Sequence, residues 1–198
     1  MYRPIQVASP KRRANVLAKA RYSLYKSELR EDFLSKCGYC DTSDHYSGGR
    51  RGYHIDHFAP KSKFQHLKND YGNLVYCCPI CNIGKSDNWP GNDPLTSFVA
   101  DKGFVDPCHV DYGTHLARSL AGEIVPLTGL GAYIHRKLRL NLKRRQICWL
   151  LDRMEEQLEQ LGKMLEGKNF EADKDEIKAL CELQREYFKY VGQLKRAE

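Results

Sequence analysis

Two pairs of cysteines, each separated by two residues, constrain this sequence more than any other feature. They are Cys37-x2-Cys40 and Cys78-x2-Cys81. Four thiolates at this spacing can close a tetrahedral zinc site, and such a site leaves no coordination position open. We therefore expect a structural zinc ion that folds the domain and takes no part in catalysis. The neighbouring Cys77 would break the two-residue spacing, so Cys78 is the predicted ligand.

Cysteine usage and hydropathy indicate the cellular compartment. Reducing compartments disfavour disulfides, so the eight cysteines are better explained as metal ligands or thiols than as a disulfide framework. Cys108, Cys148 and Cys181 lack a partner at the zinc-ligand spacing and are interpreted as core or surface thiols. The chain begins without a continuous apolar segment, and no apolar stretch approaches the roughly 20 residues that a bilayer span needs. We therefore expect a cytoplasmic protein that makes no membrane contact.

The net charge of +7 is unevenly distributed along the chain. Residues 1–151 carry an excess of Lys and Arg, whereas residues 152–198 carry a small excess of Asp and Glu. A basic surface beside a metal motif favours binding of a polyanion, so we expect the first part of the chain to bind DNA. The basic clusters are Lys11-Arg12-Arg13, Arg50-Arg51, Lys61 with Lys63, Arg136-Lys137-Arg139 and Lys143-Arg144-Arg145.

The pattern of apolar residues predicts an α+β fold with a small core and flanking helices. Residues 11–35 show the spacing of an amphipathic helix. Residues 53–58 and 74–76 read as short strands, and a short helix is expected to begin near Asn82. The turn-rich run 41–52 is typical of a flexible loop.

The second half of the chain is predicted to form loops and then a helical hairpin. Residues 91–131 are rich in Gly, Pro and Asp, which indicates loops with a short strand or two. Apolar residues recur at helical spacing over 147–165 and 177–194, with a break at 167–169. The hairpin either completes its own core or docks a partner as a coiled coil. The predicted regions are an N-terminal helical arm at 1–36, a core at 37–90, an extension at 91–146 and the hairpin at 147–198.

Polar residues between and just after the cysteine pairs are those that a metal-assisted nuclease requires. Asp56 and Asn82 offer hard oxygen ligands for Mg²⁺ or Mn²⁺, and most of an octahedral shell stays open for water and phosphate. A neutral His57 can take a proton from the attacking water, and Lys85, one helical turn after Asn82, is expected to reach a phosphate. His54 shares a strand face with Asp56, so it is either a phosphate contact or extra metal ligand, or a surface histidine. Each residue alone has a structural explanation, but together they favour catalysis.

The complete pattern resembles a known family. Its segments are Cys37-x2-Cys40, Ile55-Asp56-His57-Phe58-x-Pro60, Asp70-Tyr71-Gly72-Asn73-Leu74 and Cys78-x2-Cys81-Asn82 followed by Lys85. The pattern resembles the HNH endonuclease motif in its four-cysteine, zinc-stabilised form, and it covers residues 37–86. The resemblance implies the ββα-metal fold, with His57 as general base and Asp56 and Asn82 as ligands of one Mg²⁺-like ion. It also implies that Asn73 holds the loop and orients the base.

A weaker similarity extends beyond this motif. It rests on Phe104-Val105-Asp106-Pro107-Cys108, Gly122-Glu123-Ile124 and Leu138-x-Leu140-Asn141-Leu142 with Arg145. These segments are similar to the C-terminal extension of HNH subunits that pair with ATPases in bacterial anti-phage systems, including the PtuB-like subunits of the Septu system. The similarity implies an ATPase partner and phage or other invading DNA as substrate. The sequence has no GxxxxGK[ST] motif, so any ATP dependence must come from another chain.

Three functional hypotheses follow from these patterns. The favoured one is an HNH DNA endonuclease that uses a single catalytic metal ion and serves as the effector of a defence complex. The alternative is a zinc-stabilised nucleic-acid-binding or adaptor subunit without catalysis, which would not need the Asp, His and Asn residues of the motif. A third, compatible hypothesis is a docking subunit that is active only inside a complex through residues 147–195. Whether the chain forms a homodimer is left open.

Overall fold

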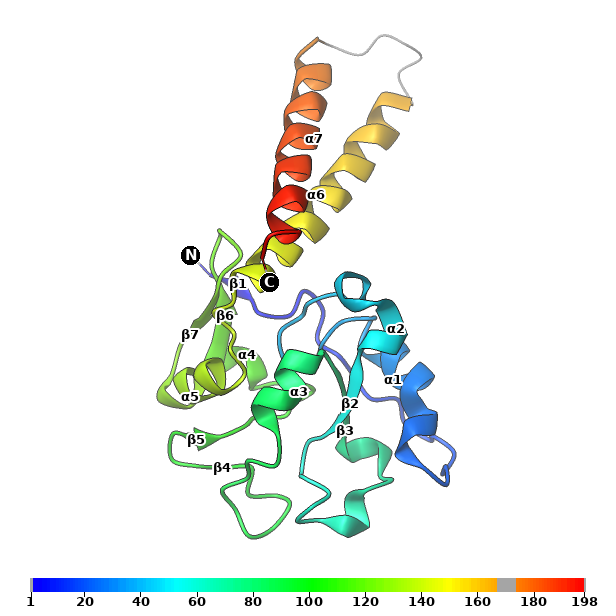
Figure 1. The fold of residues 1–198 in the computed structure, drawn as a ribbon, viewed down its shortest axis with the longest axis vertical. Helices are drawn as coiled ribbons and strands as arrows, with labels where there is room; N and C mark the ends of the chain where they lie inside the picture. Colours follow the sequence, from blue (N-terminus) through cyan, green and yellow to red (C-terminus); the bar gives the residue numbers. More distant parts are fainter. Residues whose placement is uncertain (1, 167–173, 198) are drawn as a thin grey trace. The chain divides into compact units, whose positions relative to one another are not determined.

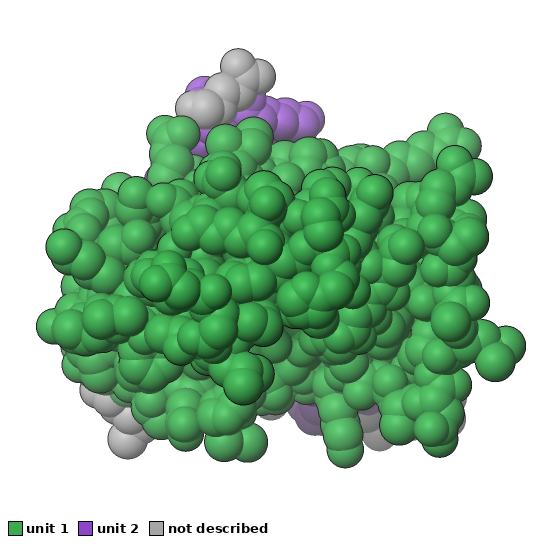
Figure 2. All heavy atoms as spheres, turned by 90° about the horizontal axis from the view of Figure 1, so that it is seen from below, with its two compact units in different colours: residues 1–142 green, residues 143–198 purple. Residues whose placement is uncertain are grey.

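The computed structural model describes residues 2–166 and 174–197, and the chain divides into two compact units. The units comprise residues 1–142 and 143–198 (Figure 2). Helices and short strands alternate along the first unit, which confirms the predicted α+β class. Among the described residues, no helix combines the length and hydropathy needed to cross a bilayer.

A strand hairpin followed by a helix forms the centre of the first unit (Figure 1). Strand β2 (His54–His57) pairs antiparallel with β3 (Leu74–Cys77), and helix α3 (Pro79–Lys85) follows β3 and packs against β2. Strand β3 is buried along its whole length, as its apolar sequence predicts. Strand β2 changes from exposed at His54 to buried at Asp56. This ββα order confirms the predicted core.

Helix α3 begins at Pro79, earlier than the predicted start near Asn82. Proline is favoured at the first helical position because its missing N–H would have no intrahelical partner there. The sulfur of Cys78 caps the helix by accepting a hydrogen bond from the Cys81 amide at 3.4 Å. Ser86 ends the helix with a left-handed φ of 49°. Asn82 therefore lies inside the helix and one turn before its end.

The predicted helix over residues 11–35 is wrong in its extent. A 3-10 helix at Tyr22–Tyr25 leads into helix α1 (Lys26–Asp32), and the residues before them form no regular helix. Arg12 gives the physical reason, because its Nε donates a hydrogen bond to the Leu74 carbonyl at 2.8 Å. This partner is distant in the sequence, so local periodicity could not reveal that it draws the segment along the core.

The predicted flexible loop over residues 41–52 is instead ordered into short helices. A 3-10 helix spans Asp44–Ser47, and helix α2 spans Gly49–Gly52. The carboxylate of the buried Asp44 accepts a hydrogen bond from Arg30 Nε at 2.6 Å. This pairing with α1 ties the segment to the core and explains why a turn-rich composition does not give a mobile loop.

A second sheet contains three short strands in the order β1-β6-β7. They are β1 (Arg3–Pro4), β6 (Leu116–Arg118) and β7 (Ile124–Pro126), and both pairings are antiparallel. Strand β1 belongs to the arm that was predicted to be helical. The buried Arg118 donates through Nη2 to the Cys40 carbonyl at 2.9 Å. This bond joins the second sheet to the first cysteine pair.

The predicted extension is more regular than its glycine content suggests. Its other elements are β4 (Phe98–Val99), β5 (Lys102–Gly103), α4 (Tyr112–His115) and α5 (Gly129–Lys137). In α5, a Cβ atom at Gly131 would lie 1.9 Å from the His115 carbonyl oxygen. This glycine therefore permits a close contact inside a helix, whereas composition alone indicated a loop.

The second unit is the predicted helical hairpin. Helix α6 (Lys143–Glu166) and helix α7 (Lys174–Leu194) lie side by side (Figure 1). The Tyr187 hydroxyl donates to the Glu155 carboxylate at 2.7 Å, which links the two helices. Helix α6 begins before the predicted start, and the predicted break at 167–169 lies outside the described residues.

Candidate active site

The four predicted zinc ligands meet in one buried cluster. The Sγ atoms of Cys37, Cys40, Cys78 and Cys81 all lie within 4.8 Å of one another, and those of Cys40 and Cys78 are 3.9 Å apart. Sulfur atoms bound tetrahedrally to zinc stand about 3.8 Å apart, given a Zn–S bond of about 2.3 Å. The cluster therefore has the size of a zinc site, as the spacing of the cysteines predicts.

The protonation of these thiols also fits a bound cation. Burial, together with hydrogen bonds from the other three thiols, raises the pKa of Cys37. A hydrogen bond with Cys37 lowers the pKa of Cys78. Four buried thiols this close cannot all ionise without a compensating cation, and a divalent ion that binds thiolates displaces their protons. The donor set fits a structural Zn²⁺ with four cysteine ligands.

Cys77 stands apart from this cluster, as predicted. Its Sγ lies 3.9 Å from the His54 carbonyl oxygen and 4.0 Å from Asn82 Oδ1. Successive side chains of a strand point to opposite faces, so Cys77 and Cys78 contact different neighbours. The cysteines that also remain outside the cluster are Cys108, Cys148 and Cys181.

One cavity brings several of the predicted catalytic side chains together. Its volume is about 760 Å³, and strand β2, helix α3 and the N-terminal segment contribute to its walls. The predicted site residues among its lining are His54, Asp56, His57 and Asn82. Asn73 and Lys85 are not part of the lining. Asn73 forms hydrogen bonds with Ala59, and Lys85 forms an ion pair with Asp56.

Asp56 is a buried carboxylate with two internal partners. The Tyr39 hydroxyl donates to Oδ2 at 2.6 Å, and Lys85 Nζ lies 3.1 Å from the same oxygen. Burial raises the pKa of Asp56, while the Lys85 charge and the Tyr39 hydrogen bond act against that rise. Asp56 Oδ1 has a weaker contact, because Lys85 Nζ lies 3.5 Å from it. The carboxylate is thus held in one orientation with an oxygen that can bind a cation.

The expectation that Lys85 reaches a phosphate does not agree with its position. The Lys85 side chain is fully buried, and its Nζ donates to the His57 carbonyl at 2.9 Å in addition to its ion pair with Asp56. The ammonium also lies 5.8 Å from the Phe104 ring centroid. A charged side chain is stable in such a place only when it is paired, and the pairing directs Lys85 toward the core. Lys85 therefore supports Asp56 and does not face substrate.

Replacing Lys85 with methionine is expected to destabilise the protein by about 3–5 kcal/mol, because it leaves the buried Asp56 carboxylate without its ion-pair partner. The free energy of unfolding of the zinc-loaded protein in urea measures this loss. Lys102→Met, at an exposed lysine of β5, is the matched control and is expected to unfold with the parent midpoint. Equal midpoints for all three proteins would show that the Lys85–Asp56 pair contributes nothing to stability.

His57 presents a defined ring nitrogen to the site. Its Nε2 lies 2.9 Å from the Lys68 carbonyl oxygen. A carbonyl oxygen only accepts, so Nε2 carries the hydrogen of the neutral ring and Nδ1 carries the lone pair. Burial lowers the pKa of His57, and the nearby Lys61 adds to this effect. The ring is thus held neutral near pH 7 with one basic nitrogen.

Asn73 holds the chain that follows His57. Its Oδ1 accepts from the Ala59 amide at 2.8 Å, and its Nδ2 donates to the Ala59 carbonyl at 2.9 Å. The Asn73 carbonyl accepts from the Phe58 amide at 2.8 Å. These bonds fix the loop after β2, which is the geometry that a loop-holding asparagine requires.

Asn82 and His54 contact each other at the edge of the cavity. Asn82 Nδ2 lies 3.1 Å from His54 Nδ1, with Asn82 half-buried and His54 exposed. The amide nitrogen donates this bond, and the amide oxygen, which has a weak contact with Cys77 Sγ at 4.0 Å, keeps a second lone pair for a ligand. His54 therefore belongs to the candidate site, next to a predicted metal ligand.

The donors in the cavity fit a hard divalent cation. Asp56 provides a carboxylate oxygen and Asn82 an amide oxygen, while His54 lines the same space. Mg²⁺ commonly binds to one or two protein carboxylates and keeps water and substrate phosphate in its other positions. Because Lys85 already balances the Asp56 charge, such an ion would depend strongly on those water and phosphate oxygens.

Sequence reasoning missed several residues around this site. Tyr39 lies between the first two cysteines, and only an aromatic residue in a CxxC gap could have signalled its contact with Asp56. Tyr22 and Lys26 line the cavity from a segment before the motif, and no spacing rule links them to it. Lys61, from a predicted basic cluster, also lines the cavity. Lys26 and Lys61 can provide the cationic charge that the buried Lys85 cannot.

Comparison with known protein families assigns this region. The family model for HNH endonuclease matches residues 37–88. Residues 37–88 form an HNH domain. The match includes both cysteine pairs, β2, β3 and α3, and therefore every site residue predicted from the motif. The HNH domain is the smaller part of the chain, and neither the curated proteins nor the solved structures gave a match.

Proposed function

We propose that this protein is an endonuclease that hydrolyses phosphodiester bonds of DNA with one catalytic Mg²⁺ or Mn²⁺ ion. The proposal rests on one observation: His57, Asp56 and Asn82 line a single cavity, and the Lys68 carbonyl fixes the His57 tautomer. An HNH domain is typical of metal-dependent nucleases, and residues 37–88 match that family.

In this proposal His57 is the general base. Its Nδ1 takes a proton from the attacking water, and the Lys68 carbonyl stabilises the resulting imidazolium through the Nε2 hydrogen bond. The lowered pKa keeps the ring neutral and ready to accept that proton near pH 7. A cation bound by Asp56 and Asn82 would supply charge stabilisation at the phosphate and the leaving oxygen. Tyr39 and Lys85 hold Asp56 in position for this role.

The charge distribution supports DNA as the substrate. Residues 1–142, which include the HNH domain, hold 20 Lys/Arg against 13 Asp/Glu, a net +7 that equals the net charge of the whole chain. Lys26 and Lys61 line the cavity itself, where a phosphate group would lie during hydrolysis. Lysine side chains neutralise phosphate charge and release counterions, so binding is expected to weaken steeply with salt.

Incubation of the purified zinc-loaded chain with supercoiled plasmid DNA and Mg²⁺ or Mn²⁺ tests the function. Hydrolysis is expected to yield nicked or linear DNA. A non-catalytic nucleic-acid-binding or adaptor subunit would instead retard the plasmid on a gel and leave it intact with either ion.

The proposal also includes a role in an anti-phage defence complex. Its support is the similarity of residues 104–145 to ATPase-paired HNH subunits, together with the amphipathic hairpin of α6 and α7. The hairpin exposes Phe188 on α7, with 69% of that residue accessible to solvent. Residues 143–198 hold 12 Lys/Arg and 12 Asp/Glu, so the hairpin has no excess of positive charge for DNA. An exposed aromatic residue on such a hairpin is better suited to a protein partner than to DNA. The proposed partner is an ATPase subunit, and the proposed substrate is phage or other invading DNA.

Phe188→Glu is expected to abolish copurification of the ATPase with the full-length chain expressed in its native host, because it places a charge in the apolar contact. Mass spectrometry of the purified complex measures the loss. Gln184→Glu adds the same charge at an exposed polar position of α7 and is expected to retain the partner. Recovery of no ATPase with the parent chain, or equal recovery with Phe188→Glu, would contradict the docking role.

A homodimer of the chain would appear as a doubled mass in size-exclusion chromatography.

A further inference from the structure

Tyr22 makes a direct ring contact with the candidate general base. The ring centroids of Tyr22 and His57 are 4.6 Å apart, and the ring planes meet at 71°, an edge-to-face arrangement. Both residues line the active-site cavity. Tyr22 lies before residues 37–88, so it is outside the segment that matches the HNH family.

The segment that binds His57 also binds Tyr22. The Tyr22 amide donates to Asn69 Oδ1 at 2.9 Å, and Asn69 Nδ2 donates to the Ala20 carbonyl at 3.2 Å. The preceding residue, Lys68, provides the carbonyl that fixes His57 Nε2. Two adjacent residues therefore set the positions of both rings, and the ring contact does not depend on a loosely attached arm.

The Tyr22 side chain also contacts a lysine of the cavity. Lys61 Nζ donates to the Tyr22 hydroxyl at 3.3 Å and lies 4.6 Å from the ring centroid. The ring of Tyr22 therefore contacts both a cation and the imidazole of His57. A cation over an aromatic ring is attracted to its negative face, which favours this orientation of the tyrosine.

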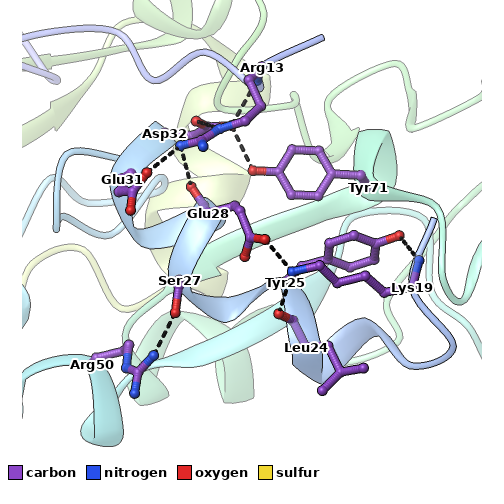
Figure 3. A network of polar contacts seen from close by, with 10 residues as sticks. All are labelled: Arg13, Lys19, Leu24, Tyr25, Ser27, Glu28, Glu31, Asp32, Arg50 and Tyr71. Carbon is purple, nitrogen blue, oxygen red and sulfur yellow. Dashed lines mark hydrogen bonds and ion pairs between the residues drawn. The ribbon is translucent and has the colours of Figure 1, made fainter. Parts of the chain in front are cut away.

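Contacts on either side of Tyr22 keep its segment in place (Figure 3). The Lys19 amide donates to the Tyr25 hydroxyl at 2.7 Å, and Lys19 Nζ donates to the Leu24 carbonyl at 2.9 Å. The ring centroids of Tyr25 and Tyr71 are 5.2 Å apart, in an edge-to-face contact. Tyr71 belongs to the HNH domain, so these contacts attach the Tyr22 segment to the domain that contains His57.

We propose that Tyr22 is a positioning residue for His57. This inference rests on the proposed role of His57 as general base. An imidazole held by one hydrogen bond at Nε2 can still turn about its Cβ–Cγ bond. Such a turn would change the direction of the Nδ1 lone pair. The edge-to-face packing of Tyr22 removes that rotation, and the aromatic ring, not the hydroxyl, provides the contact.

Three single variants separate this role from a general structural one. Tyr22→Ala is expected to lower kcat by between about tenfold and a hundredfold with KM unchanged, since ring packing and small misplacements of a catalytic group have effects of this size. Tyr22→Phe keeps the ring and is expected to retain the parent kcat. Leu24→Ala changes a half-exposed neighbour in the same 3-10 helix, outside the cavity lining, and is expected to behave as the parent.

A double variant and a spectroscopic measurement complete the test. Because Tyr22 acts through His57, adding Tyr22→Ala to His57→Ala is expected to cause no further loss of the residual rate. NMR signals of the His57 ring are expected to shift in Tyr22→Ala and to keep their parent positions in Tyr22→Phe. The NMR measurement does not depend on activity.

Several outcomes would overturn the inference. They are an unchanged kcat in Tyr22→Ala, a Tyr22→Phe variant as slow as Tyr22→Ala, a raised KM with unchanged kcat, and additive losses in the double variant. A His57→Ala protein that cuts DNA at the parent rate would overturn the proposed function, and the inference with it. An inactive His57→Ala beside a fully active Tyr22→Ala would overturn the inference alone.

Discussion

His57→Ala is expected to lower the rate of DNA cleavage by at least about a hundredfold, the usual contribution of a general base. The variant removes Nδ1 of His57, the nitrogen that carries the lone pair because the Lys68 carbonyl holds Nε2. DNA binding and folding are expected to persist, because the basic residues and the zinc ligands are unchanged. Single-turnover cleavage, gel retardation and circular dichroism measure the three properties.

The matched control is His66→Ala. His66 is an exposed histidine of the same domain that does not line the cavity, and its variant is expected to cut at the parent rate. Cleavage by His57→Ala at the parent rate would remove the general-base mechanism. Equal losses in both variants would indicate a general effect of removing a histidine from the domain.

Loss of a zinc ligand is expected to prevent folding. We expect about one zinc ion per chain. Cys40→Ser or Cys81→Ser is expected to give insoluble or unfolded protein. A structural zinc site contributes its binding free energy directly to folding, and the remaining buried thiols would lose their common cation. Elemental analysis measures the zinc content, and the soluble fraction together with circular dichroism measures folding.

Cys181→Ser provides the control for these variants. Cys181 is an exposed cysteine of α7, outside the four-cysteine cluster, and its variant is expected to stay folded with the parent zinc content. Folded, active protein that contains no zinc would contradict the structural role of the cluster.

The core of the HNH domain was predictable because its determinants are local. The spacing of Cys37-x2-Cys40 and Cys78-x2-Cys81 follows from the geometry of a tetrahedral site, and the four sulfur atoms lie within 4.8 Å of one another. The apolar run at β3 and the Pro after β2 likewise act within a few residues. The motif residues of the cavity were also predictable, since β2 pairs with β3, which leads into the second cysteine pair, and α3 contains Cys81.

Long-range pairing explains what the sequence did not reveal. Arg12 reads as part of a DNA-binding basic cluster on a helix, but its bond to the Leu74 carbonyl draws that segment along the core. Lys85 reads as a phosphate contact because it lies one helical turn after Asn82, but Asp56 and the His57 carbonyl hold it inside. Tyr22 carries no motif signal, because its contact with His57 depends on the folded position of Asn69.

The most direct test of the proposed active site is the DNA cleavage rate measured against Mg²⁺ or Mn²⁺ concentration, with zinc content determined in the same samples. The account predicts that cleavage begins only when the divalent ion is added, while zinc stays at about one ion per chain. It also predicts that Asn82→Ala requires more of the added ion than the parent protein. Cleavage at full rate without added ion, or DNA binding without cleavage at every concentration, would contradict it.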